Sequence, residues 1–304
     1  NPTFRAKSPL VVVPVSVRDK KHLSIDGLTA SDFVLLDNGT PRSIQVDPSG
    51  VYQSGISAVI VIETGAAAHA ALLKIKKTGS LIDGYITGAD GDAALLTAGA
   101  DVTVAQPFTP DGVQMRAAFR HLKATGGNDS HTLDAVRQGL DMLGAKPSDR
   151  RRILILISES RDRGSKTKPQ EILDMAQRSN VTIYTVTYSA YLTPFTTKAT
   201  DLGTPPDVGI NPLAWVTEIS RLAKENIGEA LAVSTGGRHL SFRTLHSLED
   251  DMASIGKELH SQYLLSFTPP FEATPSYHSL QISVKTHAGA IIHARPGYWS
   301  TSVQ

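Results

Sequence analysis

Two carboxylates, Glu63 and Glu159, stand where runs of apolar residues end. Glu63 follows residues 58–62, whose β-branched composition is typical of a strand buried on both faces, and Glu159 follows a similar run at 153–157. In open α/β sheets, ligands bind outside the carboxyl ends of the strands, so both residues mark one expected site. Two carboxylates at neighbouring strand ends could serve as general acid and base if their surroundings separate their pKa values.

The sequence lacks the other groups that such chemistry needs. No G-x-G-x-x-G motif follows a strand, and no pair of histidines is spaced for zinc on one helix. There is no cysteine, which excludes thiol catalysis and cysteine-bound metal centres. No nucleophile or positioned histidine accompanies the two glutamates. We therefore predict no catalytic residues, and we keep a carboxylate-based hydrolase as the weaker alternative.

The composition is that of an ordinary globular protein. Of the 304 residues, 40% are hydrophobic and 19% charged, and the net charge of +1 does not indicate a nucleic-acid partner. No apolar run approaches the roughly 20 residues that cross a bilayer, so we expect no membrane span within this sequence. The chain opens at Asn1 without an initiator Met or a signal peptide, and we expect any targeting segment to lie outside it.

Residues 57–261 alternate strand-like and helix-like segments, which predicts a doubly wound, mostly parallel sheet. Two strands joined through Gly99 predict one antiparallel edge. The apolar spacing predicts helices at 72–86, near 109–122, 133–143, 169–180 and 247–259. Ser247 and Asp250 are interpreted as the capping box of the last helix.

The segments on either side of this unit, 1–56 and 262–304, are predicted to be β structure. Pro14 favours an edge or a bulge for the strand at 11–17. Two hairpins are expected: one joins 33–36 to 43–46 through Asn38-Gly39, and the other joins 279–285 to 290–295. Asp37 and Asn38 are interpreted as turn residues only. Because each segment is small for a stable core, we predict that they pack as one β-sandwich into which the α/β unit is inserted.

Nearly the whole length of the chain resembles a known family. The resemblance lies in the order and spacing of several short segments. They are residues 27–33, 37–39, 58–68, 91–93, 106–109, 126–127, 155–158, 235–238, 263–265 and 295–298. Residues 57–260 resemble a von Willebrand factor A domain. The whole chain is similar to a bacterial family, common in acidobacteria, that carries such a domain between β segments.

The resemblance implies a metal site whose expected ligands are altered here. The resembled fold binds a divalent cation through Asp-x-Ser-x-Ser in a first loop, Thr in a second and Asp in a third. At the first-loop positions this chain has Glu63, Gly65 and Ala67, so two hydroxyl ligands are missing. Mg²⁺ prefers hard oxygens in a near-ideal octahedron, which these substitutions disturb.

The second and third loops leave alternatives open. Ser130 and Thr132 are equally eligible for the Thr position, and Glu159 stands for the third-loop Asp. We predict a degenerate site without cofactor, in which loop amides or Arg161 hydrogen-bond the two glutamates. The alternative is Mg²⁺ or another divalent cation held by Glu63, Thr132 and Glu159, with Asp129 and Asp162 as further carboxylates.

The favoured hypothesis is a non-enzymatic adhesion, scaffold or protein-binding module. Its face would comprise the strand-end loops at 63–69, 126–132, 158–165 and the long segment 189–212. The predicted contact residues are Glu63, Thr64, His69, Asn128, Asp129, Ser130, Thr132, Ser160, Arg161 and Asp162. Metal-dependent ligand binding through Glu63 and Glu159 is the runner-up. The resemblance also implies a secreted, periplasmic or cell-envelope location.

Overall fold

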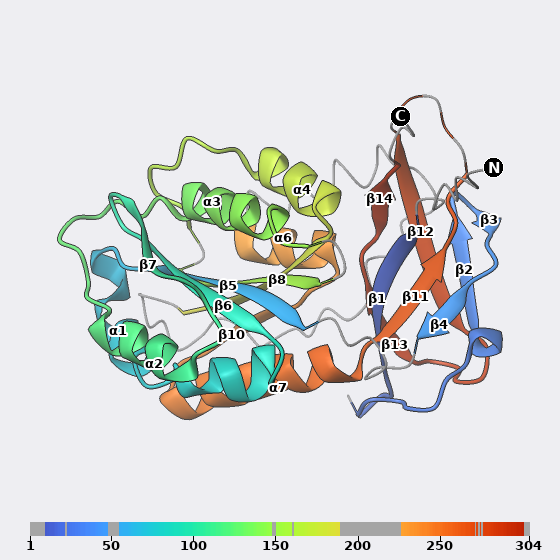
Figure 1. The fold of residues 1–304 in the computed structure, drawn as a ribbon, viewed down its shortest axis with the longest axis horizontal. Helices are drawn as coiled ribbons and strands as arrows, with labels where there is room; N and C mark the ends of the chain where they lie inside the picture. Colours follow the sequence, from blue (N-terminus) through green and yellow to red (C-terminus); the bar gives the residue numbers. More distant parts are fainter. Residues whose placement is uncertain are drawn as a thin grey trace, which may run out of the picture.

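A computed structural model describes residues 10–21, 23–47, 55–147, 150–159, 161–188, 226–270, 272, 274 and 276–300. Figure 1 shows an α/β unit beside a β-sandwich. Ser160 and the segment 189–212 lie outside the described residues.

A six-stranded sheet forms the centre of the α/β unit, in the order β10-β9-β8-β5-β6-β7. Every neighbouring pair is parallel except β6 with β7, which confirms the predicted sheet with one antiparallel edge. All eight residues of the central strand β5 are buried, as its apolar run predicts. The strands are β5 (Ile56–Glu63), β6 (Asp92–Ala98), β7 (Val102–Thr109), β8 (Arg151–Ser158), β9 (Val181–Thr187) and β10 (His239–Ser241).

Helices cover both faces of this sheet, and each face has its own apolar core. One layer holds α1 (His69–Ile75), α2 (Gly112–His121) and α7 (Leu245–Ser261). The other holds α3 (Thr132–Gly144), α4 (Pro169–Arg178) and α6 (Ile227–Thr235) (Figure 1). A short 3-10 turn, η2 (Ala66–Ala68), leads into α1. The apolar stripe predicted for the last helix is confirmed, since Leu248, Met252, Ile255 and Leu259 are all buried in α7.

Two predictions about these helices are wrong. The expected helix at 72–86 is broken: α1 ends at Ile75, and a π-helical segment, η3 (Ile82–Thr87), follows. The Thr78 hydroxyl donates to the Ile75 carbonyl, an alternative to continued helix bonding. The capping box of α7 is made by Thr244 and Ser247 rather than by Ser247 and Asp250, so the helix begins three residues earlier.

The sandwich consists of two four-stranded sheets, in the orders β13-β1-β11-β4 and β14-β12-β2-β3. Both sheets mix strands from the two ends of the chain, and they share one core. This confirms that the α/β unit is inserted in a sandwich; the exact limits at 57 and 261 stay predictions. The strands are β1 (Val11–Arg18), β2 (Phe33–Asp37), β3 (Thr40–Pro41), β4 (Gln45–Asp47), β11 (Tyr263–Phe267), β12 (Tyr277–Val284), β13 (Ile291–Ala294) and β14 (Gly297–Trp299).

Both predicted hairpins are wrong in their pairing. Asn38 and Gly39 do form a turn with φ of 48° and 78°, but β2 pairs with Thr40–Pro41, and β4 lies in the other sheet. Likewise β12 pairs with β2 and β14, whereas β13 pairs with β1. β4 and β13 each pack apolar side chains into the shared core from the sheet opposite their predicted partner. A local turn pattern carries no information about this packing.

The strand that contains Pro14 lies inside its sheet, which corrects the expected edge. β11 pairs with β1 from Val11 to Val15, while the ladder to β13 starts only at Val15. Pro14 therefore pairs with Leu264 of β11 on one side, while on the other side it precedes the first residue that pairs with β13. Its missing N–H is tolerated because no β13 partner lies opposite it.

Buried polar contacts join the sandwich to the α/β unit. Glu258 of α7 accepts from Arg18 of β1 at 2.5 Å and from Arg238 at 3.1 Å. Arg295, just after β13, donates to the Asn180 side chain at 2.8 Å. The Arg18–Glu258 contact therefore holds α7 against the sandwich, and the Arg295–Asn180 contact joins the sandwich to the residue before β9.

Candidate functional site

Glu63 ends β5 beneath the strand-end surface and is only 1% exposed. Its Oε2 atom accepts the Glu159 backbone N–H at 2.6 Å and the Tyr188 hydroxyl at 2.8 Å. Burial, and after it the charge of Glu63, raises the pKa of Tyr188 far above its ordinary value. Tyr188 therefore stays protonated and keeps donating to the carboxylate.

Glu159 follows β8 and is 7% exposed. Its Oε2 atom accepts from the Arg163 guanidinium at 2.6 Å. We predicted that loop amides or Arg161 hydrogen-bond the two glutamates. The observed donors include the Glu159 amide, but the arginine is Arg163 and not Arg161. The side chain of Arg161 is exposed.

The second loop is tied to the third through Ser130. The Ser130 N–H donates to the Arg163 carbonyl at 2.8 Å, and the Arg163 N–H donates back at 3.2 Å. Within the described part of the chain, the buried Oγ of Ser130 and the buried Oγ1 of Thr64 have no hydrogen-bond partner. The hydroxyl of Thr132 donates to the Ser130 carbonyl at 3.3 Å, so it is engaged within its own loop.

Asp162 serves the start of α3. Its Oδ1 accepts the Leu133 N–H at 3.1 Å and the Ser165 hydroxyl at 2.7 Å, while Ser165 Oγ also accepts the Leu133 N–H at 3.0 Å. These bonds satisfy an amide that the first turn of a helix leaves unpaired. Asp162 is therefore a capping residue here rather than a ligand aimed at the surface.

The structure divides the predicted contact residues into two sets. His69, Asn128, Asp129 and Arg161 are exposed, whereas Glu63, Thr64, Ser130 and Thr132 are buried; Asp162 is partly buried, and Ser160 lies outside the described residues. The first and second loops lie together, since the Ala66 N–H donates to the Gly127 carbonyl at 2.9 Å. The buried set thus supports a surface made by the exposed set.

The residues present do not fit a divalent cation of the kind that the resemblance implies. At Gly65 an added Cβ would lie 3.0 Å from the Asp129 carbonyl oxygen, so the closed loop leaves little room for a serine ligand. Glu63 and Glu159 already accept hydrogen bonds, and the oxygens at these loops left without a partner among the described residues are two hydroxyls, Ser130 Oγ and Thr64 Oγ1. No group of three or more His, Cys, Asp or Glu in the described ranges is arranged to hold a metal. Two neutral hydroxyls are a poor site for a cation that prefers six oxygens, carboxylates among them.

Two of the solved structures that are similar to this chain are the following. One is a von Willebrand factor type A protein from Catenulispora acidiphila, at 12% identity and a TM-score of 0.50, covering 100% of this chain and 76% of that one. Another is an aerotolerance-related membrane protein from Bacteroides fragilis, at 12% identity and a TM-score of 0.47, covering 67% and 98%.

The α/β unit has a von Willebrand factor A-like fold. No protein-family model matches the sequence, and no curated protein matches it. The likeness concerns the fold, at an identity too low to transfer a partner or a metal.

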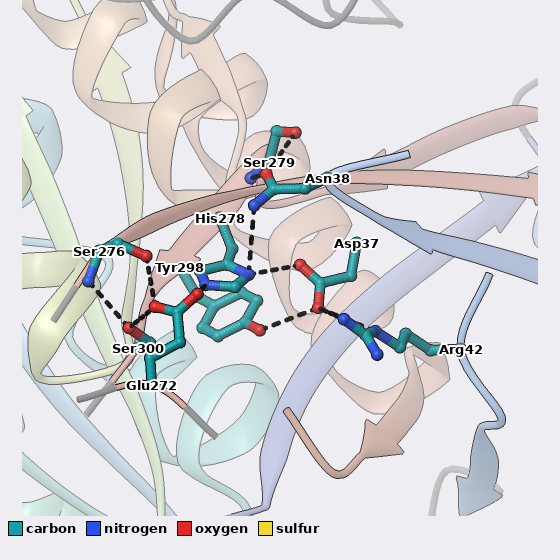
Figure 2. A network of polar contacts seen from close by, with 9 residues as sticks. All are labelled: Asp37, Asn38, Arg42, Glu272, Ser276, His278, Ser279, Tyr298 and Ser300. Atoms are coloured by element: carbon teal, nitrogen blue, oxygen red, sulfur yellow. Dashed lines mark hydrogen bonds and ion pairs between the residues drawn. The ribbon is translucent and has the colours of Figure 1, made fainter. Parts of the chain in front are cut away.

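A second polar cluster, in the sandwich, was missed by the sequence interpretation. Figure 2 shows His278 of β12 between Asp37 at the end of β2 and Glu272. The His278 Nδ1 atom lies 2.6 Å from Asp37 Oδ1, and Nε2 lies 3.0 Å from Glu272 Oε1. Both ring nitrogens therefore lie within hydrogen-bond distance of a carboxylate oxygen. Asp37 is thus the buried centre of a network rather than a simple turn residue.

Further donors complete this sandwich network. The Asp37 carboxylate also accepts from Arg42 at 3.0 Å and from the Tyr298 hydroxyl at 3.3 Å. Hydrogen bonds from Ser276, His278 and Ser300 lower the pKa of Glu272 to about 2. Among the described residues of this cluster, Ser276 and Ser300 donate to Glu272 and Ser279 donates to Asn38, so none of the three hydroxyls is bonded to the imidazole as an activated nucleophile would be. No local signal could have found it, because Asp37 and His278 are 241 residues apart.

Proposed function

We propose that this chain is a non-enzymatic protein-binding module, of adhesion or scaffold type, whose strand-end face contacts a protein partner without a standard magnesium ion. One observation carries the proposal: the carboxylates below the face are satisfied by Tyr188, Arg163 and a backbone amide, while polar side chains at Asn128, Asp129 and Arg161 face solvent. Exposed polar loops on a rigid base are a common arrangement for recognition.

Burial and existing hydrogen bonds disfavour the two alternatives. A hydrolase would need a substrate in contact with Glu63 and Glu159, which are 1% and 7% exposed. Metal-dependent binding would require Glu63 and Glu159 to exchange their present donors for a cation.

The location is a part of the same proposal. We infer a secreted, periplasmic or cell-envelope protein from the resemblance to a bacterial family of exported proteins. In the described part of the chain, none of the helices has the length and apolarity required to span a bilayer.

Site-specific photo-crosslinking tests the proposed face. A photoreactive residue replaces Asn128 in one version of the protein and Lys21, an exposed sandwich residue, in a matched control. We expect one defined protein adduct from position 128 in the source cells and none from position 21. The Asp129→Lys change should abolish that adduct. Equal adducts from both positions, or an adduct that survives the charge reversal, would count against the face.

A further inference from the structure

We propose that Arg163 takes the place of a divalent cation at the strand-end face, so that the three loops are held in their arrangement without metal. The inference rests on the proposed function only in naming this surface as the binding face. The substitution of a guanidinium for a metal ion can be tested without any partner.

The first argument is the charge of the buried glutamates. The backbone amide of Glu159 donates a 2.6 Å hydrogen bond to the carboxylate of Glu63. Both residues are buried from solvent. Two neighbouring buried carboxylates require a cation, a proton or several donors. Among the described residues, the cation in contact with this pair is Arg163, whose Nη2 atom lies 2.6 Å from Glu159 Oε2.

The second argument is that Arg163 connects all three loops, as a shared metal ion would. Its side chain binds Glu159, which in turn binds Glu63 at the end of β5. Its backbone exchanges two hydrogen bonds with Ser130 of the second loop. A residue held at both backbone and side chain is a fixed charge rather than a passing surface contact.

The third argument is that the space for metal ligands has been closed. The Asp129 carbonyl would lie 3.0 Å from a Cβ at position 65, and position 67 is an alanine without a donor atom. The loop geometry therefore suits the internal cation and would have to open for a hydrated metal ion. The Arg163 side chain keeps 30% of its surface exposed, so the positive charge is still presented to solvent.

Thermal unfolding of a small set of variants tests this inference. We would compare the wild type with Arg163→Met, Arg163→Lys and the double variant Arg163→Met/Glu159→Gln, each in EDTA and in millimolar Mg²⁺, Ca²⁺ or Mn²⁺. The matched control is Arg137→Met, which removes an exposed Arg–Glu pair with an Nε–Oε1 distance of 3.1 Å. That control should change the melting temperature by less than about 1 °C.

The expected pattern separates charge from packing. The wild type should melt at the same temperature with and without metal. Arg163→Met should lose roughly 4 °C or more in EDTA, because it leaves two buried carboxylates without their cation. Removing one charge with Glu159→Gln should restore most of that loss, and a divalent cation should restore part of it in the single variant.

Two results would overturn the inference. One is a wild type whose melting temperature rises with metal, while the same rise is absent from the single variant Glu159→Gln, which is measured alongside. The other is an Arg163→Met protein that is as stable as the wild type, or that is rescued by neither Glu159→Gln nor metal, which would make Arg163 a packing residue. If Arg163→Met fails to fold, Arg163→Lys tests the inference instead. Because it keeps a positive charge at position 163, it should stay stable in EDTA and should gain no stability from metal.

Failure of this inference is distinguishable from failure of the proposed function. The melting experiments contain no partner, so they report on the cation alone. A lost cross-link from Asn128 with an intact Arg163 pattern would remove the binding face and leave the internal cation standing.

Discussion

The molecule contains two buried polar clusters that solve one electrostatic problem in different ways. In the strand-end cluster, Arg163 balances Glu159 beside Glu63; in the sandwich cluster, His278 lies between Asp37 and Glu272. Arginine keeps its charge at every accessible pH, whereas histidine is charged only while both ring nitrogens hold protons. The strand-end cluster lies beneath the proposed binding face, while the sandwich cluster joins β2, from the first part of the chain, to β12, from the last part.

The largest expected effect is on the sandwich cluster. His278→Leu leaves the fully buried Asp37 without its closest partner and removes the link to Glu272. Loss of one member of a buried charged pair costs about 3–5 kcal/mol, so we expect a reduction of that order in the free energy of unfolding in denaturant. The exposed His287→Leu change is the control and should stay within about 0.5 kcal/mol. Similar losses in both variants would remove the distinction between a lock and an ordinary histidine.

A change at the strand-end cluster should have a smaller effect. Gly65→Ser brings a Cβ to 3.0 Å from the Asp129 carbonyl, and we expect a loss of about 1–3 kcal/mol in unfolding free energy. Gly126→Ser, in the neighbouring loop with nothing within 4 Å of its Cβ, should be nearly neutral.

The triple change Glu63→Asp, Gly65→Ser and Ala67→Ser should still give no heat on titration with Mg²⁺ while Arg163 is present. Tight Mg²⁺ binding by that variant would show that the ligands alone, and not the internal cation, decide metal binding.

The pH dependence of stability sharpens the comparison. The pKa of Glu272 falls to about 2 in the folded protein, so its stabilising contribution is present above the ordinary glutamate pKa of 4.5 and is lost as the pH falls towards 2. Glu272→Gln should therefore lose less stability than the wild type between pH 5 and pH 2, as measured by the denaturation midpoint. Parallel curves for the two proteins would contradict the contribution of Glu272.

The smallest effect on stability is expected at the exposed face. Asp129→Lys changes a solvent-facing side chain and should alter the unfolding free energy by no more than about 0.5 kcal/mol. The same change should abolish partner cross-linking from position 128. A large loss of stability would move Asp129 from the proposed contact surface into the structural base.

Elements with a strong local pattern were predicted well. The β-branched run at 58–62 became the buried strand β5, and the residues spaced along α7 became its buried stripe. Patterns of this kind need no knowledge of distant residues, because the periodicity itself states which side chains are buried. The predictions that failed, the helix at 72–86 and both hairpins, required knowledge of the neighbouring layer.

The candidate site was predicted in part for the same reason. Glu63 and Glu159 could be placed at strand ends because an apolar run ends at each of them. The partner of Glu159 could not be chosen between nearby arginines, since Arg161 and Arg163 differ only in where the loop points them. The Asp37–His278 contact had no local signal at all.

The sequence by itself determined the buried strands, their mostly parallel order and the sandwich built from both ends, because apolar periodicity and segment size follow from the chain alone. The tertiary structure decided which charges meet. Arg163 reaches Glu159 through a loop held against Ser130, and His278 reaches Asp37 across 241 residues. Burial requires that each of these charges have a partner, but only the packed fold brings that partner within hydrogen-bond distance.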